Sequence, residues 1–126
     1  ISQDATGYIW LGTREGLNRY DGYRMKIFRG QAGDTGGLKS NYISSLLPGS
    51  DGKMWIGTTS GLHLYYPNTG SIVQVRLPVL SAGQSPHPEV GALFRDRKGV
   101  LWVGTAHGLL RMTDSTGLRF EMLADA

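Results

Sequence analysis

Two aspartates, Asp4 and Asp96, are the carboxylates of this sequence whose positions could support acid–base chemistry. Two carboxylates held about 5–10 Å apart can cleave a glycosidic bond, one as the general acid and the other as the base or nucleophile. Each of these aspartates, however, stands three residues before a glycine in a phrase that the sequence repeats. An aspartate in such a turn accepts hydrogen bonds from nearby backbone amides. We therefore predict a structural role for both, and no catalytic residue.

The three histidines, His63, His87 and His107, are the other side chains that could do chemistry, as metal ligands. No two of them have the spacing of a metal site, no carboxylate cluster accompanies them, and the chain has no cysteine. Ordinary solvent-facing or partly packed histidines are expected, with no metal and no cofactor. No glycine-rich stretch opens a helix, so a phosphate-binding loop is not indicated either.

The composition is that of a folded domain without an affinity for nucleic acid. Hydrophobic residues make up 40% of the 126 residues and charged residues 18%, so a packed core is expected. Lys and Arg number 13 against 10 Asp and Glu, and they are scattered rather than gathered on one face as nucleic-acid binding requires. No stretch reaches the roughly 18 apolar residues of a membrane span, so we expect no membrane insertion of this segment.

The elements that position these residues come from a repeat. A tryptophan followed two residues later by Gly-Thr, and then by Gly-Leu, occurs three times. The copies are Gly7-Tyr-Ile-Trp-Leu-Gly-Thr13 with Gly16-Leu17, Gly52-Lys-Met-Trp-Ile-Gly-Thr58 with Gly61-Leu62, and Gly99-Val-Leu-Trp-Val-Gly-Thr105 with Gly108-Leu109. The period of 45 to 47 residues between tryptophans is that of a β-propeller blade.

Each repeat divides into four short strands separated by turn residues, without the 3.6-residue apolar period of a helix. The expected first strands are 42–47 and 90–94, with only the end of one near Ile1, and the expected fourth strands are 23–28, 72–77 and 118–123. The fold class is therefore all-β, with about three four-stranded antiparallel blades of a larger propeller ring of seven blades. The expected repeats are 1–41, 42–88 and 89–126.

The repeated tryptophans and glycines are predicted to be structural. An indole with a glycine two residues on can act as a wedge between blades, because the glycine lets the neighbouring sheet approach closely. These residues are Trp10, Gly12, Trp55, Gly57, Trp102 and Gly104.

Binding is predicted at the variable tips of the hairpins between second and third strands. These tips and the connectors between blades, 30–40 and 79–88, lie on one side of a propeller, and a rigid scaffold with varied loops suits a binding surface. The candidate ligand-facing residues are Arg14, Glu15, Thr59, Ser60 and His107.

The stretch from Asp4 to Tyr23, with Trp-Leu-Gly-Thr and Leu-Asn-Arg-Tyr-Asp-Gly-Tyr, and the stretch 101–109 resemble the two-component regulator propeller repeat. The second repeat departs from this pattern with Gly49 where the others have aspartate, and with Tyr66-Pro67 where Tyr-Asp is common. The resemblance covers essentially the whole chain. It implies the periplasmic or extracytoplasmic sensory region of a membrane-anchored hybrid two-component receptor, or of a related diguanylate cyclase.

The resemblance implies a non-catalytic sensor that binds a small molecule or a glycan, while a histidine kinase or diguanylate cyclase domain elsewhere in the parent protein supplies the output. The Asp-Gly turn before each tryptophan is also similar to the Asp-box of glycosidase propellers. A fragment of a carbohydrate-active propeller enzyme, or a protein-interaction scaffold, is therefore the alternative.

Three blades cannot close a propeller, which needs roughly four to eight. The sequence begins at Ile1 as if a strand were already under way, so we expect a piece of a larger protein. The expected partners are the remaining blades of the same chain or another copy.

Overall fold

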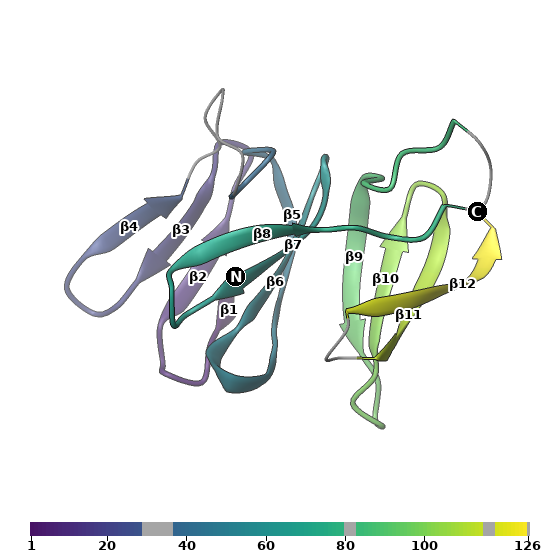
Figure 1. Ribbon diagram of the computed structural model, residues 1–126. Coiled ribbons are helices and arrows are strands. Elements are labelled where there is room, and N and C mark those ends of the chain that lie inside the picture. The colour runs from purple at the N-terminus through teal and green to yellow at the C-terminus, as the bar shows by residue number, and fades with distance from the viewer. Residues whose placement is uncertain (29–36, 80–82, 115–117, 126) are drawn as a thin grey trace.

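The computed structural model describes residues 1–28, 37–79, 83–114 and 118–125, which form three four-stranded antiparallel sheets (Figure 1). Within each sheet the strands lie side by side in chain order. The first sheet contains β1 (Ser2–Gln3), β2 (Ile9–Gly12), β3 (Leu17–Tyr20) and β4 (Met25–Phe28). The second contains β5 (Ile43–Pro48), β6 (Met54–Thr58), β7 (Gly61–Tyr66) and β8 (Ser71–Val75). The third contains β9 (Val90–Arg95), β10 (Leu101–Thr105), β11 (Gly108–Asp114) and β12 (Arg119–Asp125).

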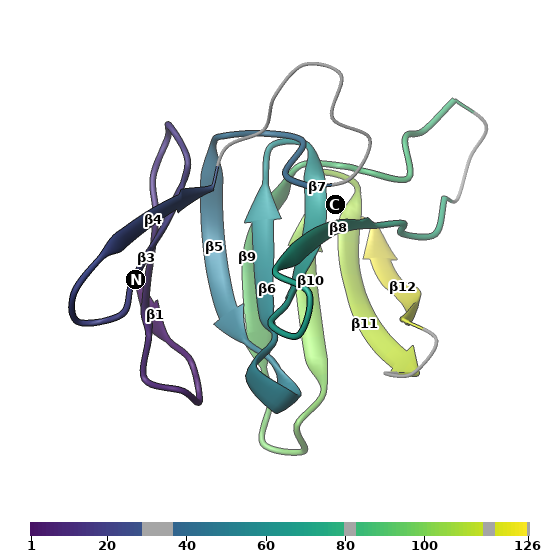
Figure 2. The same cartoon turned by 60° about the vertical axis from the view of Figure 1, so that its left-hand side comes forward.

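The three sheets fan out from their first strands, as the blades of a propeller do. Strand β5 contacts β1 and β2 of the first sheet, and β9 contacts β5 and β6 of the second (Figure 2). The fourth strands, β4, β8 and β12, form the edge of each sheet opposite its first strand (Figure 1). The predicted all-β propeller architecture, with three four-stranded antiparallel blades, is confirmed.

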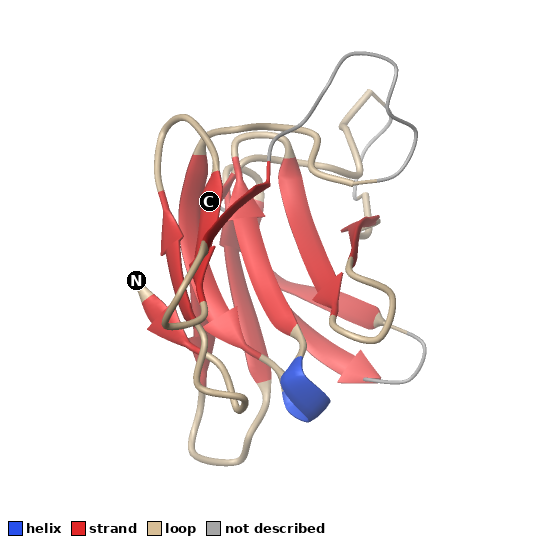
Figure 3. Cartoon of the chain, turned by 90° about the vertical axis from the view of Figure 1, so that its left-hand side faces the viewer, coloured by secondary structure: helices blue, strands red, loops and turns tan. Residues whose placement is uncertain are grey.

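The two ends of the sheets differ in what they carry. One end carries the β2–β3, β6–β7 and β10–β11 hairpins together with the connectors between sheets; we call it the hairpin end. The opposite end carries the turns that precede the tryptophan strands, including the short 3₁₀ helix η1 (Ser50–Gly52), and we call it the turn end (Figure 3).

Trp10 and Trp55 pack between neighbouring sheets, as predicted for wedges. Trp10 is completely buried, with its ring centroid 4.8 Å from Tyr65 of the second sheet and 5.6 Å from Phe28 of its own. Trp55, 5% exposed, packs edge-on against Phe120 of the third sheet, with the centroids 6.2 Å apart. The core therefore consists of two layers, one in each space between adjacent sheets.

The glycines two residues after these tryptophans admit the first strand of the next sheet. A Cβ atom on Gly12 would overlap Ile43 Cγ2. A Cβ atom on Gly57 would overlap Ser45 Oγ of its own sheet and would also lie 2.7 Å from Val90 Cγ1 of the next sheet. Ile43 and Val90 are both buried β-branched residues near the start of a first strand. Glycine is therefore required at both positions by the closeness of the neighbouring sheet.

Several expected strand boundaries were wrong by one or two residues, for local reasons. The fourth strand of the first sheet begins at Met25 rather than 23, because Asp21 Oδ1 accepts the N–H groups of Tyr23 and Arg24 and holds them in the turn. Leu118 was expected in a strand but has φ of 51°, in the left-handed region, so β12 begins at Arg119. The expected strand 42–47 begins one residue later, at Ile43.

Both faces of the tryptophan strand are buried only in the second sheet. All five residues of β6 are buried, because the second sheet has a neighbour on each side. Three residues of β2 and three of β10 are at least partly exposed, since each of these sheets has one neighbour among the described residues.

His63 departs from the expectation of a solvent-facing or partly packed histidine. It lies on β7, facing the first sheet, and its side chain is fully buried. Its Nε2 accepts a hydrogen bond of 3.2 Å from the backbone N–H of Lys39. Alternate residues of β7 face opposite sides of the second sheet, and the side that carries His63 and Tyr65 lies against the first sheet.

Candidate functional site

Asp4 holds the first turn together and receives the tryptophan of its own sheet. Its Oδ1 accepts the backbone N–H groups of Thr6, Gly7 and Tyr8 at 2.9–3.0 Å, and its Oδ2 accepts the indole N–H of Trp10 at 2.9 Å. A buried indole N–H needs an acceptor. Asp4, only 8% exposed, supplies it, in addition to the backbone capping that the sequence predicts.

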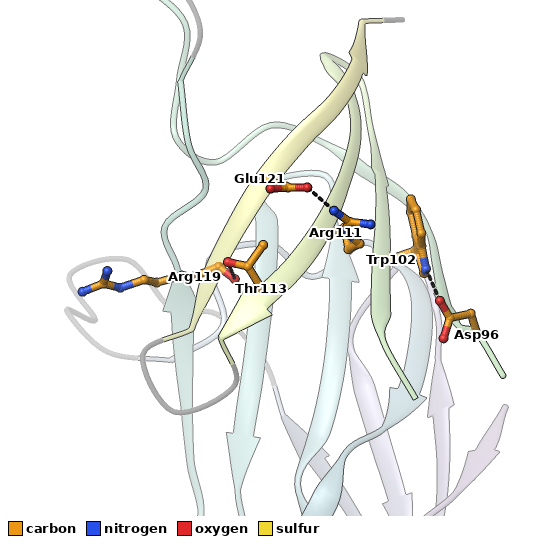
Figure 4. Close-up of polar contacts among 6 residues, drawn as sticks. All are labelled: Asp96, Trp102, Arg111, Thr113, Arg119 and Glu121. Atoms are coloured by element: carbon orange, nitrogen blue, oxygen red, sulfur yellow. Dashed lines mark hydrogen bonds and ion pairs between the residues drawn. The ribbon is translucent and has the colours of Figure 1, made fainter. Parts of the chain in front are cut away.

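Asp96 repeats this arrangement in the third sheet. Its Oδ1 accepts from the amides of Lys98 and Val100 at 2.9 and 3.0 Å, and its Oδ2 accepts from the indole of Trp102 at 2.8 Å (Figure 4). The hydrogen bond from Trp102, and then that from Val100, lowers the pKa of Asp96 below 3.8. Both oxygens of each aspartate are occupied within its own sheet, and the second sheet lies between them.

The histidines lie apart from any carboxylate cluster. Among the described residues, no group of three or more His, Cys, Asp or Glu side chains is placed to hold a metal ion. His87 is half-buried on the connector before β9, and burial lowers its pKa below 6.5. The described segments also contain no helix with the length and apolar character that crossing a bilayer requires.

The hairpin tips are shaped by one repeated threonine. The hydroxyl of Thr13 donates to the Gly16 carbonyl at 2.9 Å and accepts the Glu15 amide at 3.1 Å. Thr58 and Thr105 make the same two hydrogen bonds in the second and third sheets, at 2.8–3.1 Å. The glycine that closes each hairpin has positive φ, 108° at Gly61. The threonine and the glycine thus hold the backbone of each tip, and the side chains between them are not needed for its conformation.

The structure places all five predicted ligand-facing residues at these tips, on the hairpin end. Arg14, Glu15 and Thr59 are exposed, whereas Ser60 and His107 are half-buried. They belong to three adjacent sheets, and no described pocket brings them together.

Parts of the connectors lie beside the tips. The guanidinium of Arg14 lies over the Tyr42 ring, 5.7 Å from its centroid, and Thr59 Oγ1 lies 2.7 Å from Ser40 Oγ in a hydrogen bond. In the third sheet the Ala106 amide donates to the Glu89 carbonyl at 2.9 Å. The first and second tips therefore lie beside the connector that leads into β5, and the third tip lies beside the connector that leads into β9. Residues 30–36 and 80–82 of the predicted connectors lie outside the described residues.

A cleft of about 240 Å³ opens at the turn end, between the second and third sheets. Its lining includes Lys53, Trp55, Arg95 and Asp114, none of which the sequence singles out as ligand-facing. Its position depends on the packing of two sheets whose contacts are far apart in sequence.

Sequence reasoning also missed Arg19, which joins the first sheet to the second. Its guanidinium lies over the rings of Tyr8 and Trp10, 4.9 and 5.7 Å from their centroids. Its Nη1 donates to the hydroxyl of Tyr65 at 2.8 Å. The only signal in the sequence is an arginine nine residues after tryptophan, at Arg19 and again at Arg111.

Comparison with known proteins finds a family model that matches two stretches of the chain. Residues 37–60 and 84–107 match the family model described as two component regulator propeller. Over 35 residues, 28% of this chain, the sequence is 49% identical to histidine kinase P4 of Formosa agariphila, of which the match covers 3%.

Solved structures of similar fold are extracellular domains from B. thetaiotaomicron. The domain assigned to the hybrid two-component system BT3049 superposes with a TM-score of 0.80 at 25% identity, over 98% of this chain and 18% of that one. The extracellular domain of BT4673, assigned to a one-component system, matches with the same TM-score and identity over 16% of its length. The chain thus spans less than a fifth of each of these solved domains.

Proposed function

Because the chain carries two-component regulator propeller repeats, we propose that it is part of the extracellular sensory region of a bacterial two-component receptor. Its role in that region is to bind a ligand, and it catalyses no reaction. Support comes from the similarity to extracellular domains of such systems over 98% of the chain. The match to a histidine kinase supports a kinase as the output domain of the parent protein.

The observation that carries the binding role is the construction of the hairpin end. Three tips from adjacent sheets lie at this end, and Thr13, Thr58 and Thr105 hold their backbones. The side chains at the tips contribute little to the fold, so they can be chosen for a ligand. Arg14 and Glu15 add a cation and an anion to this surface, and Thr59 adds a hydroxyl.

The arrangement of the aspartates favours binding over hydrolysis. A general acid must hold and release a proton at the substrate. Asp4 and Asp96 instead accept hydrogen bonds with both oxygens, at the turn end and in separate sheets. Their role in the turns supports a binding module over a glycosidase fragment.

The proposal is tested by titrating the ¹⁵N-labelled chain with a panel of neutral and acidic oligosaccharides and small metabolites. The amide chemical shifts are recorded at each ligand concentration. A ligand of this surface should shift amides at 14–15, 59–60 and 106–107. The variant Arg14→Ala should weaken binding, whereas Arg97→Ala, an exposed arginine at the turn end, should leave it unchanged. Shifts confined to the turn end, or equal effects of the two variants, would contradict the proposal.

A further inference from the structure

The second sheet lacks the aspartate that receives the tryptophan indole in the other two sheets. In each of those sheets an aspartate oxygen accepts the indole N–H, as Asp96 Oδ2 does from Trp102 at 2.8 Å (Figure 4). The residue at the same position of the second repeat, six before its tryptophan, is Gly49. A Cβ atom on Gly49 would lie 3.2 Å from the indole nitrogen of Trp55. A carboxylate side chain at this position would therefore start directly beside that nitrogen.

The turn of the second sheet closes without this aspartate. The Gly49 amide donates to the Lys53 carbonyl at 2.9 Å, and the Lys53 amide donates to the Ser50 carbonyl at 3.1 Å. Among the described residues, however, none replaces the aspartate as acceptor of the Trp55 indole N–H. The group that loses its partner in this sheet is thus the indole, and the turn itself keeps its hydrogen bonds.

The cleft of about 240 Å³ at the turn end is lined by Trp55, and we call it the turn-end cleft. Two cationic side chains also line it. Lys53 follows η1 in the second sheet (Figure 3), and Arg95 ends β9 in the third. The apolar part of the lining consists of Leu64, Val100, Leu101 and Met112.

The two cations of the cleft are not neutralised within the described part of the chain. Arg95 is half-buried, and its Nε atom is buried without a hydrogen-bond partner among the described residues. The Lys53 ammonium lies over the Tyr66 ring, 5.6 Å from its centroid. Neither cation forms an ion pair with a described carboxylate. Asp114 also lines the cleft, so two cations and one anion leave it with a net charge of +1.

We propose that the turn-end cleft binds a small organic carboxylate. The carboxylate of the ligand accepts the indole N–H of Trp55, as the aspartate does in the other sheets, and lies between Lys53 and Arg95. A guanidinium recognises a carboxylate through two parallel hydrogen bonds, and the Nε atom of Arg95 supplies one of them. The apolar remainder of the ligand packs against Leu64 and Met112.

This site is separate from the surface proposed above for the hairpin end, and it does not depend on that proposal. The cleft opens at the opposite end of the sheets. Arg14→Ala, which weakens binding at the hairpin tips, should therefore leave binding of a carboxylate in the cleft unchanged. Either proposal can fail without the other.

The test titrates the ¹⁵N-labelled chain with acetate, butyrate and benzoate at pH 7 and constant ionic strength. Benzamide is the neutral isostere of benzoate. The Trp55 indole N–H resonance should shift to saturation with at least one carboxylate, and benzamide should not move it. The indole resonances of Trp10 and Trp102 should stay in place, because aspartates already accept their protons.

Two arginines of the third sheet give a matched pair of variants. Arg95→Gln should weaken the binding of the carboxylate at least about 10-fold, because it removes a charge-assisted hydrogen bond. Arg97→Gln removes the same charge from an exposed side chain two residues away, where solvent screens it. It should change the affinity by less than about twofold.

Gly49→Asp supplies the acceptor from the chain itself. Gly49 has φ of −101° and ψ of −171°, an extended conformation that aspartate adopts, and its Cβ would need only small shifts of the Trp55 and Lys53 side chains. The variant should stay folded, as its urea midpoint would show, and lose saturable binding because its carboxylate takes the same donor. Ser50→Asp adds the same charge to the exposed neighbour and should weaken binding by no more than about threefold.

Three results would overturn the proposal. One is the absence of a saturable shift of the Trp55 indole with all three carboxylates, or an equal shift with benzamide. Another is binding that survives both Arg95→Gln and Gly49→Asp. The third is saturation by sulfate and by none of the carboxylates, which would assign the cleft to an inorganic anion.

Discussion

Acidification is expected to destabilise the protein through His63, whose neutral imidazole is buried between the first and second sheets. Burial is the main cause that lowers its pKa from 6.5 to about 4. The nearby positive charges of His87 and Lys39 act in the same direction. An interaction with the Gly61 backbone offsets part of this lowering of the pKa. Its geometry is not that of a hydrogen bond, since among the described residues the Nδ1 atom of His63 has no hydrogen-bond partner.

The sign and size of the effect follow from the two pKa values. The unfolded chain takes up the proton near pH 6.5 and the folded chain only near pH 4, so the unfolded state binds more protons between them. The free energy of unfolding therefore falls as the pH falls through this window. At about 1.4 kcal/mol per pKa unit, the loss is about 2 kcal/mol at pH 5 and about 3 kcal/mol below pH 4. Asp21 and Asp96, with pKa values lowered from 3.8, lose their contribution only below that range.

Urea unfolding followed by tryptophan fluorescence, at pH 7.5 and pH 5, measures this loss. His63→Gln keeps an acceptor for the Lys39 amide without titrating, so it should retain only the smaller pH dependence due to His87, whose pKa burial also lowers. His107→Gln, which removes a histidine at a hairpin tip, should behave as the wild type. If His63→Gln lost as much stability as the wild type between these pH values, the assignment to His63 would be refuted.

Three further predictions concern the packing of the sheets. Gly57→Ala should lower the free energy of unfolding by about 2–3 kcal/mol, because the added methyl group overlaps Ser45 Oγ and meets Val90 Cγ1 at 2.7 Å; the urea midpoint measures this. Asp4→Ala should cost about 2–3 kcal/mol by removing the acceptor of four hydrogen bonds, and should shift the indole N–H resonance of Trp10. Arg19→Met and Tyr65→Phe should each destabilise by about 1 kcal/mol, and a double-mutant cycle should show that their effects are coupled rather than additive.

The repeat made the architecture predictable from the sequence. Three equal intervals from tryptophan to Gly-Leu fix the same pair of strands three times, and a period of 45–47 residues leaves room for four strands. Gly12 and Gly57 were predicted to admit a neighbouring sheet because each follows a tryptophan by two residues, and the structure shows the neighbour there. The sequence therefore predicts the structural features that recur in every repeat.

Contacts between repeats could not be read in the same way. The hydrogen bond from Arg19 to Tyr65 joins residues 46 positions apart, and only the packing of two sheets brings them together. The second sheet has Leu64 where the others have arginine, so the position shows no constant chemistry. The burial of His63 was missed because the equivalent positions hold Asn18 and Leu110, one polar and one apolar. The repeat therefore gives no consistent signal that this position is buried.

The two ends of the sheets differ in how their polar groups are used, and this difference bears on function. At the turn end, Asp4 and Asp96 each accept backbone amides and an indole, so changing either one breaks the sheet that it supports. At the hairpin end, the repeated threonine and glycine satisfy the backbone, and the tip residues between them take part in few contacts. Substitutions at the tips therefore cost little stability, whereas substitutions at the turns cost much. Under the proposed binding role, a change of ligand therefore needs substitutions at the hairpin end alone, while the aspartate turns keep the blades intact.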